Sequence, residues 1–293
     1  MLTRGGLGTV VVLIALVAAA LAFGPASTGS VAVSELSKHT HIHGIAVASG
    51  SPSRVYIATH HGFFVVEPDG MASRLSETGD DFMGFTPHPT DSAMLYASGH
   101  PAAGGNLGFI ASVDGGRTWR QSAAGVNGPV DFHQMDVSRV DPAVIYGVHG
   151  GLQVSRDGGQ TWQVAGRVPD GLIDLAASAK DAETLYAATK GGLFMSSDGG
   201  GTWRPAYRVK RTVTMVQAAA DGALYAFVYG RGLIRAIEPG LDWSLVGDGF
   251  GERYLLHLAV DPADPEKLYG VDDQESVLAS TDGGRTWVAF GDL

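Results

Sequence analysis

An eight-residue motif that recurs at regular spacing constrains the fold of this chain more than any other feature. The motif reads Ser-x-Asp-Gly-Gly-x-Thr-Trp and occurs at residues 112–119, 155–162, 196–203 and 280–287. Its aspartates, Asp114, Asp157, Asp198 and Asp282, are separated by 43, 41 and 84 residues, so a unit of about 42 residues repeats and lacks one intact motif. Degenerate copies at residues 67–70 and 238–243 complete a set of six units. Internal repeats of this length are typical of β-propellers and solenoids.

Each unit also carries the strand pattern of a propeller blade. A short apolar run is followed by a turn, and a second run contains a tyrosine, at Tyr56, Tyr96, Tyr146, Tyr186, Tyr225 and Tyr269. A third run leads into the motif, and a fourth begins near its tryptophan. Four short strands per unit are the content of one blade. The sequence therefore predicts an all-β, six-bladed β-propeller over residues 39–293, with no stretch left for a second domain.

The chemistry of the motif explains its residue types. Glycine accepts positive φ, and an aspartate side chain can accept hydrogen bonds from backbone N–H groups of its own turn. The Ser and Thr hydroxyls can close the same turn, and tryptophan packs a large apolar face between sheets. We therefore expect a structural role for the motif residues Asp114, Trp119, Asp157, Trp162, Asp198, Trp203, Asp282 and Trp287.

The four octamers match the Asp-box, also called the bacterial neuraminidase repeat. This repeat is found in sialidases, in other propeller glycoside hydrolases, in sortilin-type receptors and in photosystem assembly factors. The chain resembles the exported, sialidase-like and glycosyl-hydrolase-like propellers of this group over nearly its whole length after the N-terminal segment. The resemblance implies the fold and no single activity, because these families do different things on one scaffold.

The N-terminal segment and the composition point to an exported protein. After Arg4, residues 5–23 form an uncharged apolar run, so residues 1–30 are predicted to be a signal peptide or a membrane anchor with a short linker. The chain contains no cysteine, which excludes disulfides and thiolate chemistry. The net charge of −10 argues against a nucleic-acid partner. We expect an extracytoplasmic location, either secreted, periplasmic or attached to the outer side of the cytoplasmic membrane.

Most of the histidines fall in loops on one face of the predicted propeller. In each blade, the start of the first strand and the connection from the second strand to the third lie opposite the Asp boxes. These loops hold His41, His43, His60 and His61 in blade one, Asp81, Met83 and His100 in blade two, and Asp131, His133 and His149 in blade three. Alternation along a strand puts residues two apart on the same side. Side chains from three adjacent blades are therefore predicted to converge at one mouth of the central channel.

These residue types favour a ligand-binding site that holds a metal ion. Imidazole and carboxylate groups suit zinc, and a methionine among them would favour copper. The predicted metal ligands are His41, His43, Asp131 and His133, and the residues predicted to contact the ligand are His60, His61, Met83, His100 and His149. A polar pocket without a metal is the other interpretation of the same residues. The ligand itself is a small molecule, a glycan or a protein.

An enzyme and a protein-binding module are alternatives at the same face. A glycoside hydrolase needs two carboxyl groups at a defined separation, and Asp81 and Asp131 are the candidates. The resemblance to sialidases implies a clamp of three arginines for a sugar carboxylate. The Arg-Ile-Pro motif of that clamp is absent, and Arg211, Arg231 and Arg253 lie in units without the mouth histidines. An assembly factor or a receptor would use the mouth to bind a partner protein.

Overall fold

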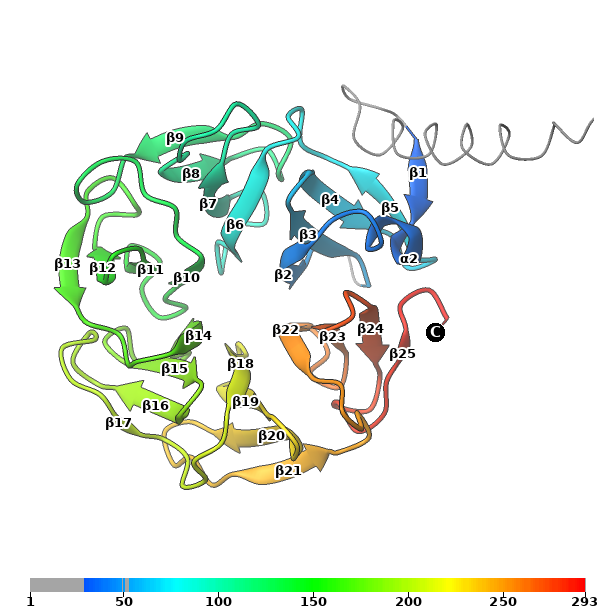
Figure 1. Cartoon of the computed structure of the whole chain (residues 1–293), viewed down its shortest axis with the longest axis vertical. Coiled ribbons are helices and arrows are strands. Elements are labelled where there is room, and N and C mark those ends of the chain that lie inside the picture. Colours follow the sequence, from blue (N-terminus) through cyan, green and yellow to red (C-terminus); the bar gives the residue numbers. More distant parts are fainter. Residues whose placement is uncertain (1–28, 49, 51–52, 293) are drawn as a thin grey trace, which may run out of the picture.

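Six antiparallel sheets surround a central axis in the computed structural model, which describes residues 29–48, 50 and 53–292. Figure 1 views the disc along this axis, with the sheets following one another around the ring in sequence order. Each sheet is built from one sequence unit. The predicted all-β, six-bladed propeller is therefore confirmed.

Each blade runs from a strand at the channel to a strand at the rim (Figure 1). The first strands, which line the channel, are β2 (Ile42–Val47), β6 (Asp81–Pro87), β10 (Gln134–Val137), β14 (Leu172–Ala177), β18 (Val213–Ala218) and β22 (Leu255–Val260). The second strands are β3 (Val55–Thr59), β7 (Leu95–His100), β11 (Ile145–Val148), β15 (Leu185–Thr189), β19 (Ala223–Val228) and β23 (Leu268–Asp272). The third strands are β4 (Gly62–Val66), β8 (Phe109–Ser112), β12 (Leu152–Ser155), β16 (Gly192–Ser196), β20 (Gly232–Ile237) and β24 (Val277–Ser280). The rim strands are β5 (Met71–Arg74), β9 (Arg120–Ala123), β13 (Gln163–Gly166), β17 (Arg204–Pro205), β21 (Ser244–Gly247) and β25 (Val288–Ala289).

Blade one has a fifth strand. Strand β1 (Ser30–Ala32) pairs antiparallel with β5, and a single helical turn, α2 (Val33–Leu36), follows it. Val33 and Leu36 are buried in the core of this blade. The ordered sheet thus begins at Ser30, ahead of residue 39, where the repeat pattern starts. The predicted signal peptide or anchor lies almost entirely outside the described residues, and none of the described helices is long and apolar enough to cross a membrane.

Side-by-side packing closes the ring between the last blade and the first. Blade one uses only N-terminal strands and blade six only C-terminal strands, so no strand is shared across the junction. Ile45 of β2, Val271 of β23 and Phe290 of the C-terminal segment belong to one buried cluster. Burial of apolar surface of this kind stabilises the junction by about 25 cal/mol per Å². The sequence did not predict how the ring closes. In the structure, hydrophobic packing between blades one and six closes it.

The Asp boxes are turns between the third and fourth strands, and most of their side-chain hydrogen bonds lie within the turn. In the second box, Ser155 Oγ and Thr161 Oγ1 donate hydrogen bonds to the Asp157 carboxylate, which also accepts one from the Thr161 amide. Gly159 has a φ of 88°, and a Cβ there would lie 2.0 Å from Phe109 Cε1. Trp162 packs its indole against Phe109 and donates a hydrogen bond to the Gly159 carbonyl. In this box the aspartate, hydroxyl and indole side chains thus hold the turn together.

The degenerate copies also form turns where the repeat predicts them. Residues 67–70 connect β4 with β5, and the Gly70 amide donates to the Glu67 carbonyl oxygen. Residues 238–241 lie between β20 and β21, and Glu238 accepts hydrogen bonds from Tyr186 Oη and the Ala179 amide. Glu238 thereby fastens blade five to blade four with its side chain. At the position where the intact boxes carry the turn-forming aspartate, this copy has a glutamate that contacts the neighbouring blade.

Candidate functional site

The histidine-rich mouth lies at the ends of the blades opposite the Asp boxes. In blade two, Leu95 at the start of β7 pairs with Ser112, the first residue of a box. At the other end of the same strand, His100 pairs with Asp81 at the start of β6. His100 and Asp81 are therefore separated from the box by the full length of the strands, and the face predicted for the histidines is confirmed.

The first cluster at the mouth is formed by His43, His60 and Asp81 from blades one and two. His43 Nε2 lies 2.9 Å from His60 Nδ1, which lies 2.7 Å from Asp81 Oδ2. His43 Nε2 is also 3.4 Å from Asp81 Oδ1. The three potential ligand atoms all lie within 4.8 Å of one another. We call this group the blade-one triad.

A β-bulge aims His43 into this triad. The register between β2 and β3 shifts between Ile42 and Gly44, so His43 is the extra residue. Bulges re-aim a side chain and are common next to functional sites. The same shift occurs in blades four, five and six, where the extra residue is Ile173, Thr214 and Leu256, respectively. Blade one thus places an imidazole where those three blades carry side chains that bind no metal.

The second cluster is formed by His100, Asp131 and His133 from blades two and three, and we call it the blade-three triad. His133 Nε2 lies 2.6 Å and His100 Nε2 lies 3.0 Å from the same oxygen, Asp131 Oδ2. The other ring nitrogen of His100, Nδ1, lies 2.8 Å from the Gly105 carbonyl oxygen. Asp131 is only 6% exposed, whereas the side chains of His100 and His133 are 40% and 55% exposed. Solvent therefore reaches the imidazoles of this triad.

The structure divides the predicted metal ligands between the two triads. His43 belongs to the blade-one triad, and Asp131 and His133 belong to the blade-three triad. His41 joins neither, because its Nδ1 contacts Glu275 Oε1 at 3.1 Å and its ring lies edge-on to His60. His60 and His100, predicted to contact the ligand, complete the two triads. Metal binding by any of these residues stays a prediction.

The remaining predicted ligand contacts are placed beside the triads. His61 Nδ1 lies 3.0 Å from Thr40 Oγ1, and His149 Nδ1 lies 3.0 Å from the Asp131 carbonyl oxygen. Met83 is buried in β6, two residues from Asp81. Sequence reasoning missed Glu275, whose Oε2 also accepts a hydrogen bond from the Ile42 amide. Glu275 lies in the connection between the second and third strands of blade six, the same class of loop that holds His60.

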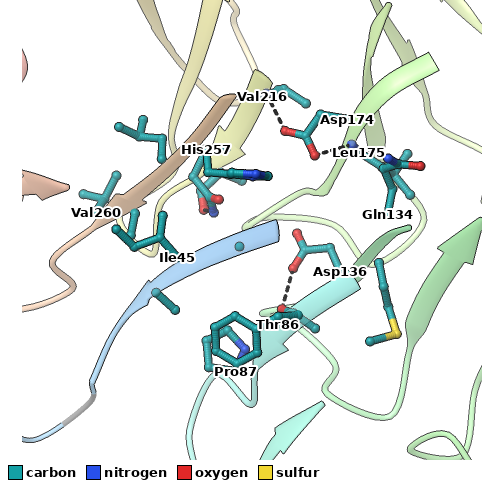
Figure 2. Close-up of a pocket in the computed structure, with 18 of the residues that line it drawn as sticks. Ile45, Thr86, Pro87, Gln134, Asp136, Asp174, Leu175, Val216, His257 and Val260 are labelled. Carbon is teal, nitrogen blue, oxygen red and sulfur yellow. Dashed lines mark hydrogen bonds between the residues drawn. The ribbon is translucent and has the colours of Figure 1, made fainter. Parts of the chain in front are cut away.

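A cavity of about 380 Å³ occupies the central channel below the triads. His43 and His133 belong to its lining at the mouth, and Thr90 and Pro262 belong to it on the box side. Figure 2 shows Asp136, Asp174 and His257 around this cavity together with apolar side chains. Ligand sites in proteins have similar volumes and combine apolar walls with a few polar groups.

The two channel carboxylates are bound to neighbouring blades (Figure 2). Asp136 accepts hydrogen bonds from Thr86 Oγ1 of blade two and from the Ala177 amide of blade four. Asp174 accepts from its neighbour Leu175 and from the Val216 amide of blade five. Burial raises the pKa of Asp136, and it raises the pKa of Asp174 to about 7. These groups join blades two to five at the channel wall.

The protonation of the mouth histidines differs between the two triads. Burial lowers the pKa of His43 to about 4, although the nearby Asp81 carboxylate opposes this shift. Burial also lowers the pKa of His61 and that of His257, whose Nε2 lies 3.2 Å from the Ile42 carbonyl oxygen. The hydrogen bond to Gly105 raises the pKa of His100. Burial therefore favours the neutral form of His43, in which one ring nitrogen carries a lone pair.

The arginines of blades five and six do not form a carboxylate clamp at the histidines. Arg253 forms an ion pair with the fully buried Asp272 of its own blade. Arg231 lies over the Tyr207 ring, and Arg211 Nη1 donates to the Gly230 carbonyl oxygen. Each of these arginines has a partner outside the two triads, consistent with the absence of the sialidase sequence motif.

Comparisons with known proteins agree with the repeat and the fold. The family model described as BNR/Asp-box repeat matches residues 153–164, which contain the second box. The comparison with curated proteins finds no match. The crystal structure of a GH74 enzyme from Niastella koreensis has a TM-score of 0.61 and 16% identity, covering 92% of this chain and 46% of that one. The chain thus spans less than half the length of this enzyme.

Two further structures show the same fold in other settings. YCF48 bound to a D1 peptide has a TM-score of 0.53 and 16% identity, covering 87% of this chain and 83% of that one. A chain of a nidogen/laminin complex has a TM-score of 0.55 and 13% identity, covering 77% and 88%. Likeness at these identities shows the fold alone. The repeated octamers, the six sheets and the repeat match together show a six-bladed β-propeller that contains Asp-box repeats.

Proposed function

We propose that this propeller binds a transition metal ion, zinc or copper, at its histidine-rich mouth, and that the ion's free coordination positions hold a ligand. The observation that carries the proposal is the blade-three triad. Its two imidazoles and one carboxylate are a donor set that zinc and copper take. Three protein ligands leave a fourth position open, as in zinc sites that bind a water or a substrate.

The hydrogen bond of His100 supports a metal ion in this triad. A backbone carbonyl only accepts, so His100 Nδ1 carries the proton that faces Gly105 O. In the neutral ring, Nε2 is then a lone pair that faces Asp131 Oδ2, a second acceptor, at 3.0 Å. A cation between the two atoms turns this repulsion into attraction. A histidine that donates its other N–H to a carbonyl is the usual orientation of a metal-ligating imidazole.

Asp131 supplies a second supporting observation. Its Oδ1 is buried and has no hydrogen-bond partner in the described part of the chain. A buried polar atom without a partner costs about 1–3 kcal/mol, and such atoms are expected to have an ion or water as partner. A second proton on His100 would also bridge to Asp131, which is the metal-free interpretation. Metal analysis distinguishes the two.

The test is the metal content of the purified protein after metal-replete preparation and removal of free ions. We expect wild-type protein to retain zinc or copper, and the His100→Ala/His133→Ala variant to lose the ion of this triad. His88→Ala is the matched control, because His88 lies on the box side and accepts from the Asp91 amide. Wild-type protein without stoichiometric metal would refute the proposal.

Glycoside hydrolysis is a second candidate function. The fold shared with a GH74 enzyme favours it, and Asp81 and Asp131 both lie at the mouth. Each carboxylate contacts two imidazoles, whereas a general acid is typically placed in an apolar pocket. A screen of glycoside substrates with wild-type and Asp131→Asn protein tests this candidate. Hydrolysis that survives metal removal and is lost in the variant would support it over metal binding.

Protein binding is a third candidate, and the neighbouring structures with a bound peptide and in a protein complex favour it. In a protein-binding propeller, Asp81→Asn and Asp131→Asn would change no enzymatic activity. They would instead lower the affinity for the partner protein. Affinity capture on wild-type protein, with the Asp131→Asn variant as comparison, separates a partner that contacts the mouth from one that binds elsewhere.

A further inference from the structure

The blade-one triad is a second group of convergent ligand atoms, and it adjoins the first through one pair of facing residues. Asp81 of the blade-one triad and His100 of the blade-three triad are directly opposite each other on β6 and β7. Side chains of residues opposed in an antiparallel pair lie on the same face of the sheet, with Cβ atoms about 4.5–5.5 Å apart. The two triads therefore occupy one continuous surface at the mouth.

Hydrogen bonding alone does not satisfy the blade-one triad. His60 Nδ1 is within 2.9 Å of His43 Nε2 and 2.7 Å of Asp81 Oδ2. A neutral imidazole has at most one proton on this nitrogen, and that proton must serve both acceptors. Giving His43 Nε2 a proton of its own sets two N–H groups against each other at 2.9 Å. Asp81 Oδ1 is buried and makes no hydrogen bond in the described part of the chain.

Other histidines of the structure have complementary partners. His61 faces the Thr40 hydroxyl, which can donate or accept. His257 faces the Ile42 carbonyl oxygen, to which it donates. His88 accepts from the amides of Thr90 and Asp91. Facing acceptors in excess of protons thus occur in the triads and not at these three histidines.

We propose that the blade-one triad binds a second transition metal ion through His43, His60 and Asp81, so that the mouth holds two ions side by side. This inference rests on the proposed function, which places the first ion at the blade-three triad. Two imidazoles and a carboxylate again form the donor set, and a coordination position stays open. His60 is 43% exposed at its side chain, which gives an ion access from solvent.

Glu275 orients this second site from outside the triad. The Glu275 carboxylate contacts His41 Nδ1 and accepts a hydrogen bond from the amide of Ile42. Ile42 is the residue immediately before His43. Its contact with the Ile42 amide fixes the backbone at the bulge that aims His43. His41 contributes no ligand atom to the triad and therefore serves as a control histidine at the same mouth.

The experiment measures zinc stoichiometry in metal-free protein titrated with zinc alone, by calorimetry and by elemental analysis after gel filtration. We expect about two ions for wild type and for His41→Gln, and about one for His60→Gln and for His133→Gln. The double variant should bind none at either triad. Glutamine keeps a polar side chain of similar size, and circular dichroism checks that each variant is folded.

The outcomes separate the two proposals. Zinc-free wild-type protein refutes the proposed function. One ion that is lost in His133→Gln and kept in His60→Gln overturns the second site and leaves the proposed function standing. One ion that is lost only in His60→Gln overturns the two-ion mouth and moves the single site to blade one. Two ions in wild type with one kept by each single variant support both.

Discussion

The Asp136→Ala substitution tests whether the channel carboxylates hold blades together or serve a ligand. The side chain accepts hydrogen bonds from Thr86 Oγ1 at 3.0 Å, the Val137 amide at 2.9 Å and the Ala177 amide at 2.9 Å. Alanine leaves all three donors without their acceptor. Each buried donor left unsatisfied costs about 1–3 kcal/mol, so the summed loss in the free energy of unfolding for three donors is about 3–9 kcal/mol.

Water in the channel cavity moves the expectation to the lower end of that range. Asp136 lines the cavity, and a water molecule entering the vacated space can accept from one of the donors. We therefore expect a loss of about 3 kcal/mol in the free energy of unfolding, measured by urea denaturation followed by tryptophan fluorescence. Gln134→Ala is the matched control, because Gln134 is two residues earlier on β10 and lines the same cavity.

The result also bears on function, because a carboxylate retained for a ligand behaves in the opposite way. Replacing a polar group that serves a ligand is often neutral or stabilising in the free protein. If Asp136→Ala unfolds within about 1 kcal/mol of wild type, the assignment of this residue as a fastener between blades is refuted. Asp136 would then become a ligand-binding candidate inside the channel.

Three further predictions concern pH and metal choice. Burial raises the pKa of Asp174 to about 7 in the folded protein, so its contribution to stability is present at acid pH and is lost as pH rises towards and through 7. The melting temperature should therefore fall less between pH 5 and 8 in Asp174→Asn than in wild type. An equal fall would contradict the assignment. Hydrogen bonds from Thr161 and Ser155 lower the pKa of Asp157 to about 2, so its contribution to stability is present at pH values above the ordinary aspartate pKa and is lost as pH falls towards 2. Asp157→Asn should therefore reduce the fall in melting temperature between pH 5 and 2.5. A fall equal to that of wild type would count against the box geometry. Met83→Leu should weaken binding of Cu(I) and leave zinc binding unchanged in chelator competition, since thioether sulfur is a soft ligand; equal effects on both ions would remove Met83 from the site.

The fold was predictable because its information is local and repeated. Each box contains most of the side-chain groups that its turn needs, from the Ser155 hydroxyl to the Trp162 indole, within eight consecutive residues. Ring closure was not predictable for the opposite reason. It depends on residues as distant as Ile45 and Phe290 meeting in one apolar cluster, and such contacts leave no periodic signal. The short strand at Ser30 lies outside the repeat and gave none either.

The site was predictable as a region and not as a set of contacts. Loop class and strand alternation placed the histidines at the correct mouth, since both depend only on blade topology. The partners of each imidazole depend on the bulge at His43 and on the angle between blades, which decide that His60 meets Asp81 and that His100 meets Asp131. Glu275 could have been found by applying the same loop rule to blade six, because it lies between the second and third strands of that blade.

The division of labour between the two faces explains why the mouth can carry chemistry. The box turns form their hydrogen bonds within the turn, as between Asp157 and Thr161, or with nearby backbone carbonyls, and they use no side chain from the other face. Strand order and blade spacing are therefore set without His60 or His133, whose side chains are 43% and 55% exposed. Surface substitutions away from buried contacts change stability by about 0.5 kcal/mol or less. The single variants His60→Gln and His133→Gln should thus have the melting temperature of metal-free wild type. A loss of metal in these variants is then due to the change at the site and not to unfolding.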